Sequence, residues 1–355
     1  MGRLKAHWEG DLLILEGKDV KKLHSKGYGE IRGERLELDL VEAAYLIKRG
    51  VVEVEVNFKE LLKKMAAEKR DNFLKFVVYS DLRDKSFVVV QERRTPFLRI
   101  YPPGARIGEK VGKQLALPLQ EEVLLSHKEL IDALVTARRL RKELLLAVVD
   151  DRLDVIYYTA SLYDPEKINR PLPELSGEGT LIYDRVFVWD TDMANELYSS
   201  GFWGHPVGLK KVAPGTRFEE PLQLNIFEAL YLNKKGILEI KDPLGSTLSS
   251  NDLENLGRQI KRNFDDKMKV FTYWRDLGYV VKPAPKYGVH YMIYKEGPGL
   301  DHAPYLCLVS KLTEKVSPID IIRAGRIASS VRKELVVSVI TATKLLNYRV
   351  FWSGI

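Results

Sequence analysis

Residues 42–50 read EAAYLIKRG, and residues 228–236 read EALYLNKKG. A second pair repeats the pattern, with LRKEL at 140–144 and VRKEL at 331–335. The two pairs are offset by 186 and 191 positions, so the internal spacing of the two copies is nearly the same. Self-similarity at a fixed spacing is typical of a duplicated structural unit. We therefore predict two tandem copies of one unit in this chain of 355 residues.

The composition is typical of a folded protein with a basic surface. Hydrophobic residues make up 45% of the chain, which is enough for several cores. A net charge of +7 favours a polyanionic partner, although 30% charged residues of both signs are also typical of a thermophile's surface. No run resembles a signal peptide or reaches the roughly 20 apolar residues that span a bilayer. We expect a cytoplasmic protein with no membrane partner and no intrachain disulfide, since Cys307 is the single cysteine.

Each copy has the pattern of a small α/β domain followed by a second domain of mixed helices and strands. Helices are expected over 42–50, 58–75, 228–236 and 250–267, and over the segments that run from Ser126 and from Ser317-Pro318 into the repeated Arg-Lys-Glu-Leu motif. β-Branched and aromatic runs predict strands. The predicted strands cover 11–16, 36–40, 51–56, 76–83, 87–91 and 144–149 in copy one, and 180–189, 208–212, 237–240, 270–277, 279–282 and 335–340 in copy two.

These elements define a fold class and a set of domains. We predict an α/β (α+β) protein in which each repeat contains a small N-terminal α/β domain and a second domain around a mixed central sheet. The linker is expected at 164–179, where prolines and glycines cluster with charged residues. The predicted domains are 1–72 and 73–163 in the first repeat, and 180–268 and 269–355 in the second.

The second copy alone contains three residues that could cleave RNA together. Tyr294 ends a predicted strand, His302 lies in the glycine-rich loop after it, and Lys333 closes the last helix. A hairpin through this loop would bring Tyr294 and His302 together. Cleavage at a ribose 2′-hydroxyl needs a base, an acid for the leaving 5′-oxygen and a cation for the transition state, and these side chains could divide those roles. Taken singly, each is more often structural than catalytic.

Other catalytic chemistries have less support. His290 and His302 are twelve residues apart with only Glu296 and Asp301 between them, which is not a metal-ligand spacing. Cys307 lies in an apolar run and is expected to be buried rather than nucleophilic, and no phosphate-binding glycine loop is present. We expect neither a metal nor another cofactor. His290 is expected on a strand beside the site, in contact with RNA.

These residues lie in motifs that resemble a known family, the archaeal tRNA-splicing endonucleases. The resemblance rests on Tyr294, on HAPYL at 302–306 and on RIASSVRK at 326–333, and it extends through 228–232 and 276–282 to nearly the whole chain. It implies that the second domains are nuclease domains and that the enzyme cuts precursor tRNA at bulge-helix-bulge intron–exon junctions. The cut is expected to need no metal and to leave 2′,3′-cyclic phosphate and 5′-hydroxyl ends.

The resemblance also implies a role for individual residues. Tyr294 would be the general base, His302 the general acid and Lys333 the stabiliser of the transition state. The interval from Tyr294 to His302 is slightly shorter than in the family. Arg326, two helical turns before Lys333, would join a second arginine to sandwich an extruded bulge base, and Arg349 is the expected second member if one residue is inserted in the preceding turn.

The first copy keeps only part of this set. Tyr101 and Lys142 stand opposite the predicted base and the predicted cation, whereas no histidine occurs between 102 and 126 and Val135 replaces Arg326. We therefore expect residues 73–163 to form a degenerate, non-catalytic nuclease domain, and residues 269–355 to form the catalytic one.

An acidic turn points to a second chain. Copy one reads DDRLD at 150–154, where copy two reads TATK at 341–344. In the family, an acidic loop at this position docks into a basic cleft of the partner subunit, and in fused chains the non-catalytic copy supplies it. The resemblance therefore implies a homodimer in which Asp150, Asp151 and Asp154 lie at the interface. The terminal strand at 350–352 is another candidate for contact between chains.

Two alternatives remain open at this point. The chain could be a non-catalytic RNA-binding subunit that needs a catalytic partner, although the joint presence of Tyr294, His302, Lys333 and Arg326 argues against this. It could also be a metal-dependent DNA nuclease of related fold, in which case a chelator would abolish cleavage.

Overall fold

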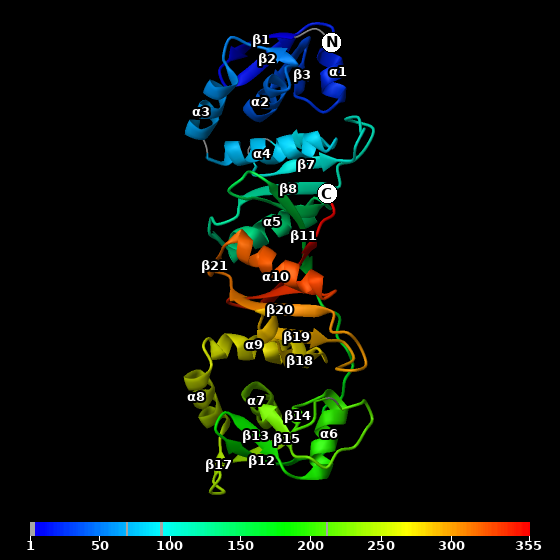
Figure 1. Cartoon of the computed structure of the whole chain (residues 1–355), viewed down its shortest axis with the longest axis vertical. Helices are drawn as coiled ribbons and strands as arrows, with labels where there is room; N and C mark the ends of the chain where they lie inside the picture. Colours follow the sequence, from blue (N-terminus) through cyan, green and yellow to red (C-terminus); the bar gives the residue numbers. More distant parts are fainter. Residues whose placement is uncertain (1–3, 69, 93–94, 211) are drawn as a thin grey trace. The chain divides into compact units, whose positions relative to one another are not determined.

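The chain forms two similar units. The computed structural model describes residues 4–68, 70–92, 95–210 and 212–355. The first unit takes in the chain up to Leu162 with the short segments Thr313–Arg323 and Val350–Ile355, and the second takes in Tyr163–Leu312 and Ala324–Arg349. Both contain the same succession of a small N-terminal domain and a larger sheet domain (Figure 1). The predicted tandem α/β repeats are confirmed.

The N-terminal domain of the first unit is a five-stranded sheet with helices packed on it. Its elements are β1 (Leu4–Glu9), β2 (Leu12–Glu16), α1 (Val20–Ser25), β3 (Glu30–Arg32), β4 (Arg35–Leu38), α2 (Leu40–Lys48), β5 (Val52–Glu53) and α3 (Phe58–Glu68). The strand order is β3-β4-β2-β1-β5. At the start of α2, Asp39 accepts hydrogen bonds from the Val41 and Glu42 amides, and the Glu42 carboxylate accepts one from the Asp39 amide. This reciprocal cap satisfies amides that have no partner within the helix.

The sheet domain of the first unit contains one mixed sheet. Its elements are α4 (Arg70–Asp84), β6 (Val88–Gln91), β7 (Leu98–Tyr101), β8 (Gln114–Gln120), β9 (Leu125–Ser126), α5 (His127–Arg139), β10 (Glu143–Val149) and β11 (Val155–Tyr163). The strands follow the order β6-β7-β8-β10-β11. β8 and β10 are parallel and the other neighbours are antiparallel. Helix α4 lies between α2 and this sheet (Figure 1).

The second unit repeats this plan. Its N-terminal elements are β12 (Gly177–Ile182), β13 (Arg185–Val188), α6 (Thr191–Gly201), β14 (His205–Pro206), β15 (Leu222–Asn225), α7 (Ile226–Lys234), β16 (Leu238–Lys241), β17 (Thr247–Leu248) and α8 (Ser250–Ile260). The elements that follow along the chain are α9 (Phe264–Asp276), β18 (Val280–Pro283), the short 3-10 helix η1 (Pro285–Tyr287), β19 (Tyr291–Tyr294), β20 (Tyr305–Lys311), β21 (Lys315–Val316), α10 (Pro318–Ser330), β22 (Glu334–Ile340) and β23 (Leu345–Trp352). Of these, β21, the start of α10 and the end of β23 belong to the first unit. The sheet order β18-β19-β20-β22-β23 matches that of the first unit. Gly50 and Gly236 follow α2 and α7 with φ of 65° and 72°, as predicted for helix ends.

Two predicted strands are wrong. Residues 76–83 and 270–277 belong to helices α4 and α9. In α4, Phe76, Val78 and Tyr79 are all buried although they point in different directions around the helix. When a helix is buried on most sides, its sequence no longer alternates between polar and apolar residues with the helical period of 3.6. A short apolar run without that period is typical of a buried strand, so the sequence predicts a strand here. Within the described ranges, however, no helix combines the length and apolar character that a bilayer crossing needs.

Other local predictions also differ from the structure. The predicted strand at 208–212 is turn and irregular chain at its described residues, 208–210 and 212, and the strand of this region is β15. The strand predicted at 51–56 is reduced to β5. Helix α6 has no counterpart among the predictions, although Asp190 caps it by accepting from the Met193 amide at 2.8 Å. α6 begins only two residues after the end of the predicted strand at 180–189, and its capping residue Asp190 directly follows that strand.

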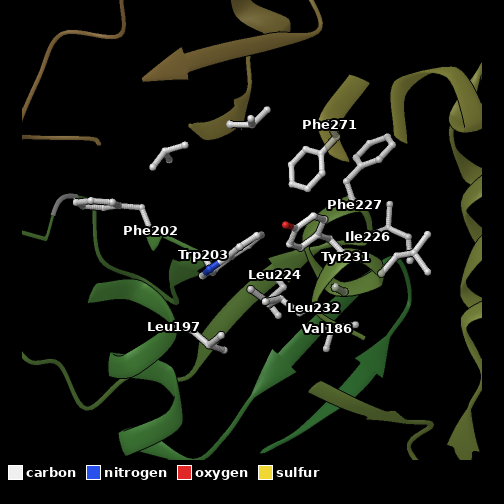
Figure 2. Packing of buried hydrophobic residues seen from close by; sticks show 14 of the residues in the cluster. Val186, Leu197, Phe202, Trp203, Leu224, Ile226, Phe227, Tyr231, Leu232 and Phe271 are labelled. Atoms are coloured by element: carbon white, nitrogen blue, oxygen red, sulfur yellow. The ribbon is translucent and has the colours of Figure 1, made fainter. Parts of the chain in front are cut away.

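An aromatic core joins the two domains of the second unit (Figure 2). Trp203 stacks on Tyr231 with ring centroids 5.2 Å apart, and Tyr231 meets the edge of Phe271 of α9 at 6.2 Å. The Tyr231 hydroxyl donates to the Asp276 carboxylate at 2.8 Å. Since α9 contributes to this core and also packs on the sheet, the N-terminal domain and the sheet domain share buried surface.

A buried glutamate connects the same two domains. The Glu228 side chain is 2% exposed, and its Oε1 accepts from the Gly204 amide at 3.1 Å and from Lys282 Nζ at 2.8 Å. Arg275 Nη2 lies 3.9 Å from this oxygen. Lys282 also donates to the Gly204 carbonyl at 2.8 Å, so β18 is tied to the N-terminal domain.

The first unit has the same glutamate without the lysine. Glu42 Oε1 accepts from the Gly29 amide at 3.1 Å, but the register of β6 and β7 places Val90 where β18 has Lys282. Burial, with a smaller effect of Asp39, raises the pKa of Glu42 from an ordinary value of 4.5 to about 8.

The substitutions Glu42→Gln and Glu228→Gln should therefore have opposite consequences. The folded chain binds the Glu42 proton more tightly than the unfolded chain, so its stability falls as pH rises from about 4.5 to about 8, by up to about 1.4 kcal/mol per pH unit. Glu42→Gln should remove this loss. Glu228→Gln leaves Lys282 buried without its anion and should lower the free energy of unfolding by about 3 kcal/mol. Urea unfolding between pH 5 and pH 9 measures both effects. A Glu42→Gln variant as unstable at pH 9 as Glu228→Gln would contradict this account.

Candidate active site

Tyr294 and His302 lie at the two ends of a loop that joins β19 to β20. The two strands are antiparallel, with Ile293 opposite Tyr305, so the predicted hairpin is present. Asp301 organises the loop, because its carboxylate accepts from the Lys295 amide at 3.0 Å and from the Gly297 amide at 2.8 Å. The loop therefore closes on itself immediately before His302.

Lys333 does not close α10 as predicted, since the helix ends at Ser330; it lies directly before β22 and reaches the same loop from there. Arg332 adopts the left-handed conformation with φ of 56°, and the Lys333 amide then donates to the Ala328 carbonyl at 2.8 Å. The Lys333 ammonium donates to the carbonyl of Ala303 at 2.6 Å. Since Ala303 follows His302, the lysine lies against the backbone beside the histidine.

The negative charge of Asp301 affects the pKa values of Tyr294 and Lys333, the two side chains beside the loop. Burial raises the pKa of Tyr294, and Asp301 adds to this effect. Burial lowers the pKa of Lys333, and Asp301 opposes this effect. The Tyr294 hydroxyl donates to the Met292 Sδ at 3.6 Å, a weak acceptor that a ribose hydroxyl could replace. Tyr294 and Lys333 thus lie around the segment that presents His302, whose side chain is exposed.

The predicted RNA contacts differ in their surroundings. Arg326 is exposed on α10. Arg349 is half-buried, donates to Glu334 Oε2 at 3.2 Å and lies over the Tyr163 ring with 4.9 Å to its centroid. To stack on a base, Arg349 would have to leave these partners. His290 lies in the bend directly before β19 rather than on a strand as predicted, and its Nδ1 accepts from the Val309 amide at 3.0 Å.

The first unit contains the same frame. Tyr101 ends β7 in the register in which Tyr294 ends β19. Lys142 follows Arg141, which is left-handed with φ of 54°, and its ammonium donates to the Gly112 carbonyl. The predicted alignment of Tyr101 and Lys142 with the second copy is confirmed by this geometry.

Two side chains of this frame are replaced in the first unit. Lys110 occupies the place of Asp301, because an isolated β-bridge joins Ile107 to Lys110 in the first unit and Pro298 to Asp301 in the second. Val111 occupies the place of His302, because each directly precedes the residue whose carbonyl accepts from the lysine, Gly112 or Ala303. A valine transfers no proton. The first unit therefore has the positions of the predicted base and the predicted cation without the predicted acid. Asp301 is not among the predicted site residues, although its place directly before His302 is visible in the sequence; its carboxylate shapes the loop.

The acidic turn of the first unit is partly shaped by its own carboxylates. Asp150 accepts from the Arg152 amide at 2.9 Å and from the Asp154 amide at 2.8 Å. Asp151 and Asp154 are exposed. Of the three acids, Asp150 therefore sets the form of the turn.

Over the part of the chain that the structure describes, no group of three or more His, Cys, Asp or Glu side chains is placed to hold a metal ion.

Comparisons with known proteins identify the family. The model for the catalytic C-terminal domain of tRNA intron endonucleases matches residues 72–157 and 264–348, and the model for their N-terminal domain matches 4–63 and 177–254. The chain is 33% identical to a tRNA-splicing endonuclease of Methanosarcina acetivorans over 95% of both chains, and 32% identical to one of Methanosarcina mazei over 96% of both. A tRNA-splicing endonuclease of Hyperthermus butylicus is 39% identical over 43% of this chain and 84% of its own. The chain belongs to the tRNA intron endonuclease family, with both of the family's domains present twice.

Proposed function

We propose that this chain cuts precursor tRNA at bulge-helix-bulge junctions between exon and intron. A ribose 2′-hydroxyl would attack the adjacent phosphate, the bond to the 5′-oxygen would break, and the products would carry 2′,3′-cyclic phosphate and 5′-hydroxyl ends. The observation that carries the proposal is the placement of Tyr294, His302 and Lys333 around one loop of the second unit, next to the loss of the histidine in the first. The relatives named tRNA-splicing endonucleases support the substrate, and a tRNA-processing role would place the activity in the cytoplasm.

Each side chain has a role that fits its surroundings. Tyr294 would take the proton of the 2′-hydroxyl as a phenolate. Burial raises its pKa, so its own proton would first have to pass to solvent. His302 is exposed and would protonate the leaving 5′-oxygen. Lys333 is fixed at the loop by Ala303 and would stabilise the charge that develops on the phosphate.

The arginines would bind the bulge. Arg326 is exposed and available to stack on an extruded base, as guanidinium planes do. Arg349 would complete a sandwich only after exchanging Glu334 and Tyr163 for the base. His290 would contact the RNA from its position beside the start of β19.

The working assembly would be a homodimer. Each chain has one complete triad, whereas a bulge-helix-bulge RNA has two cutting positions. Asp151 and Asp154 would present their charges to a basic cleft of the partner subunit, with Asp150 shaping the turn.

The variants Lys333→Met and Lys142→Met should distinguish a role of the lysine in the reaction from its structural hydrogen bond to the loop. Both lysines donate to the equivalent loop carbonyl, so each variant loses the same kind of structural contact. Lys333→Met alone should slow single-turnover cleavage of the RNA, by about 100-fold or more, with RNA binding nearly unchanged. Equal losses in the two variants would show that the lysine acts only through the frame.

The purified chain should cut a bulge-helix-bulge RNA in the presence of EDTA. His302→Ala should slow this cleavage by about 100-fold or more and leave RNA binding near that of the wild type, while His7→Ala, at an exposed position of the first unit, serves as the control. Failure of the wild-type chain to cut in EDTA would refute the self-sufficient, metal-independent reaction. A comparable loss of binding in His302→Ala would refute the acid role.

The double substitution Asp151→Asn/Asp154→Asn should weaken the dimer. Two exposed charges are removed while Asp150 still shapes the turn. Light scattering should show the mass falling from twice 40.6 kDa toward the single-chain value. The control Glu121→Gln/Glu122→Gln removes the same charge from another part of the first unit. If both double variants keep the mass of the wild type, the acidic turn does not hold the dimer.

A further inference from the structure

The segment between the two repeats makes specific contacts with the loop that carries His302. Arg170 lies in the predicted linker, and its guanidinium donates to three backbone carbonyls. Nε donates to Gly278 at 2.8 Å, and Nη2 donates to Lys295 at 2.8 Å and to Glu296 at 2.9 Å. One side chain therefore holds both the entry to β18 and the start of the catalytic loop.

The backbone around Arg170 is also fixed. The Ile168 amide donates to the Leu277 carbonyl at 2.7 Å. Gly278 has φ of 87°, and a Cβ there would lie 2.1 Å from the Ile168 carbonyl oxygen. This close approach requires a glycine. The linker is thus packed against the second unit at the point from which Arg170 extends.

The loop is built to transmit this contact to His302. Asp301 accepts from the Lys295 and Gly297 amides, so the residue before His302 is bonded to the part of the loop that Arg170 holds. On its other side the loop packs on Phe202, because a Cβ on Gly297 would lie 2.2 Å from that ring. Phe202 belongs to the aromatic core of the second unit (Figure 2).

We propose that Arg170 is a positioning residue for RNA cleavage, which fixes the loop so that His302 meets the leaving oxygen beside Tyr294 and Lys333. This inference rests on the proposed function. A guanidinium suits the task because its planar fork reaches several carbonyls at once, while an ammonium at the end of a flexible stem is less constrained. A displacement of about 1 Å in a catalytic group is enough to slow a reaction by about 100-fold.

The test compares Arg170→Met and Arg170→Lys with Arg217→Met in the full-length chain. Arg217 is an exposed arginine of the same unit whose partner is Asp192, which makes it a matched control. Three quantities are measured: single-turnover cleavage of a bulge-helix-bulge RNA, binding of the same RNA with 2′-deoxyribose at the cut sites, and hydrogen exchange of peptides covering 295–302.

Arg170→Met should slow cleavage by about 10-fold to 100-fold, leave RNA binding within about twofold and speed exchange in the loop. Arg170→Lys should lie between Arg170→Met and the wild type in both cleavage and exchange, and it remains informative if the methionine variant does not fold. Arg217→Met should match the wild type.

Three results would overturn the proposal. If Arg170→Met cleaves the RNA at the same rate as the wild type, the contact has no role in the reaction. A loss of binding as large as the loss of rate would make Arg170 an RNA contact, and unchanged loop exchange would show that it does not fix the loop. If the wild-type chain itself does not cut the RNA, the proposed function fails, and the exchange measurement still decides whether Arg170 holds the loop.

Discussion

A buried carboxylate at the start of one helix supports much of the second unit. Glu228 caps α7, accepts from the Gly204 amide and pairs with Lys282 of β18. The cap fixes where the helix begins, and the ion pair fixes where the sheet domain lies on the N-terminal domain. Because the carboxylate is almost fully buried, each of these partners is needed to keep the charge inside. The hairpin of β19 and β20, whose loop carries His302, pairs with this same strand.

The two units show which parts of this design can be lost. Glu42 keeps its cap and its amide partner but has no lysine, since Val90 occupies that position. In the same unit Val111 replaces the histidine and Lys110 replaces the loop aspartate. The backbone frame has survived these changes because hydrogen bonds between main-chain groups and buried apolar contacts do not depend on them. The first unit has Val111, Lys110 and Val90 where the second has His302, Asp301 and Lys282, while the backbone frame is the same in both.

Much of the fold could be predicted from sequence where the signal was local. The apolar spacing and terminal glycines of α2 and α7 predict helices at the right places, as do the capping signals before α5 and α10. The spacing from Tyr294 to His302 predicts the hairpin. Helices α4 and α9 were misread because their residues are buried on most sides, which removes the periodic signal. The partners of Arg349 and Arg170 lie 15 or more residues away in the chain, and no local pattern indicates them. A linker rich in proline and glycine gave no sign that one of its side chains would be an anchor.

The contacts of Ile168 and Arg170 also constrain how such a chain could be divided into two genes. A break between Leu162 and Ile168 would leave the linker on the same polypeptide as the loop that it holds. A break just after Arg170 would place that side chain on the other polypeptide, and the half that carries His302 would then recover its loop geometry only on association. A break that preserves the loop geometry of the second repeat would therefore fall after β11 ends at Tyr163 and before Ile168, well ahead of the N-terminal sheet that begins at Gly177.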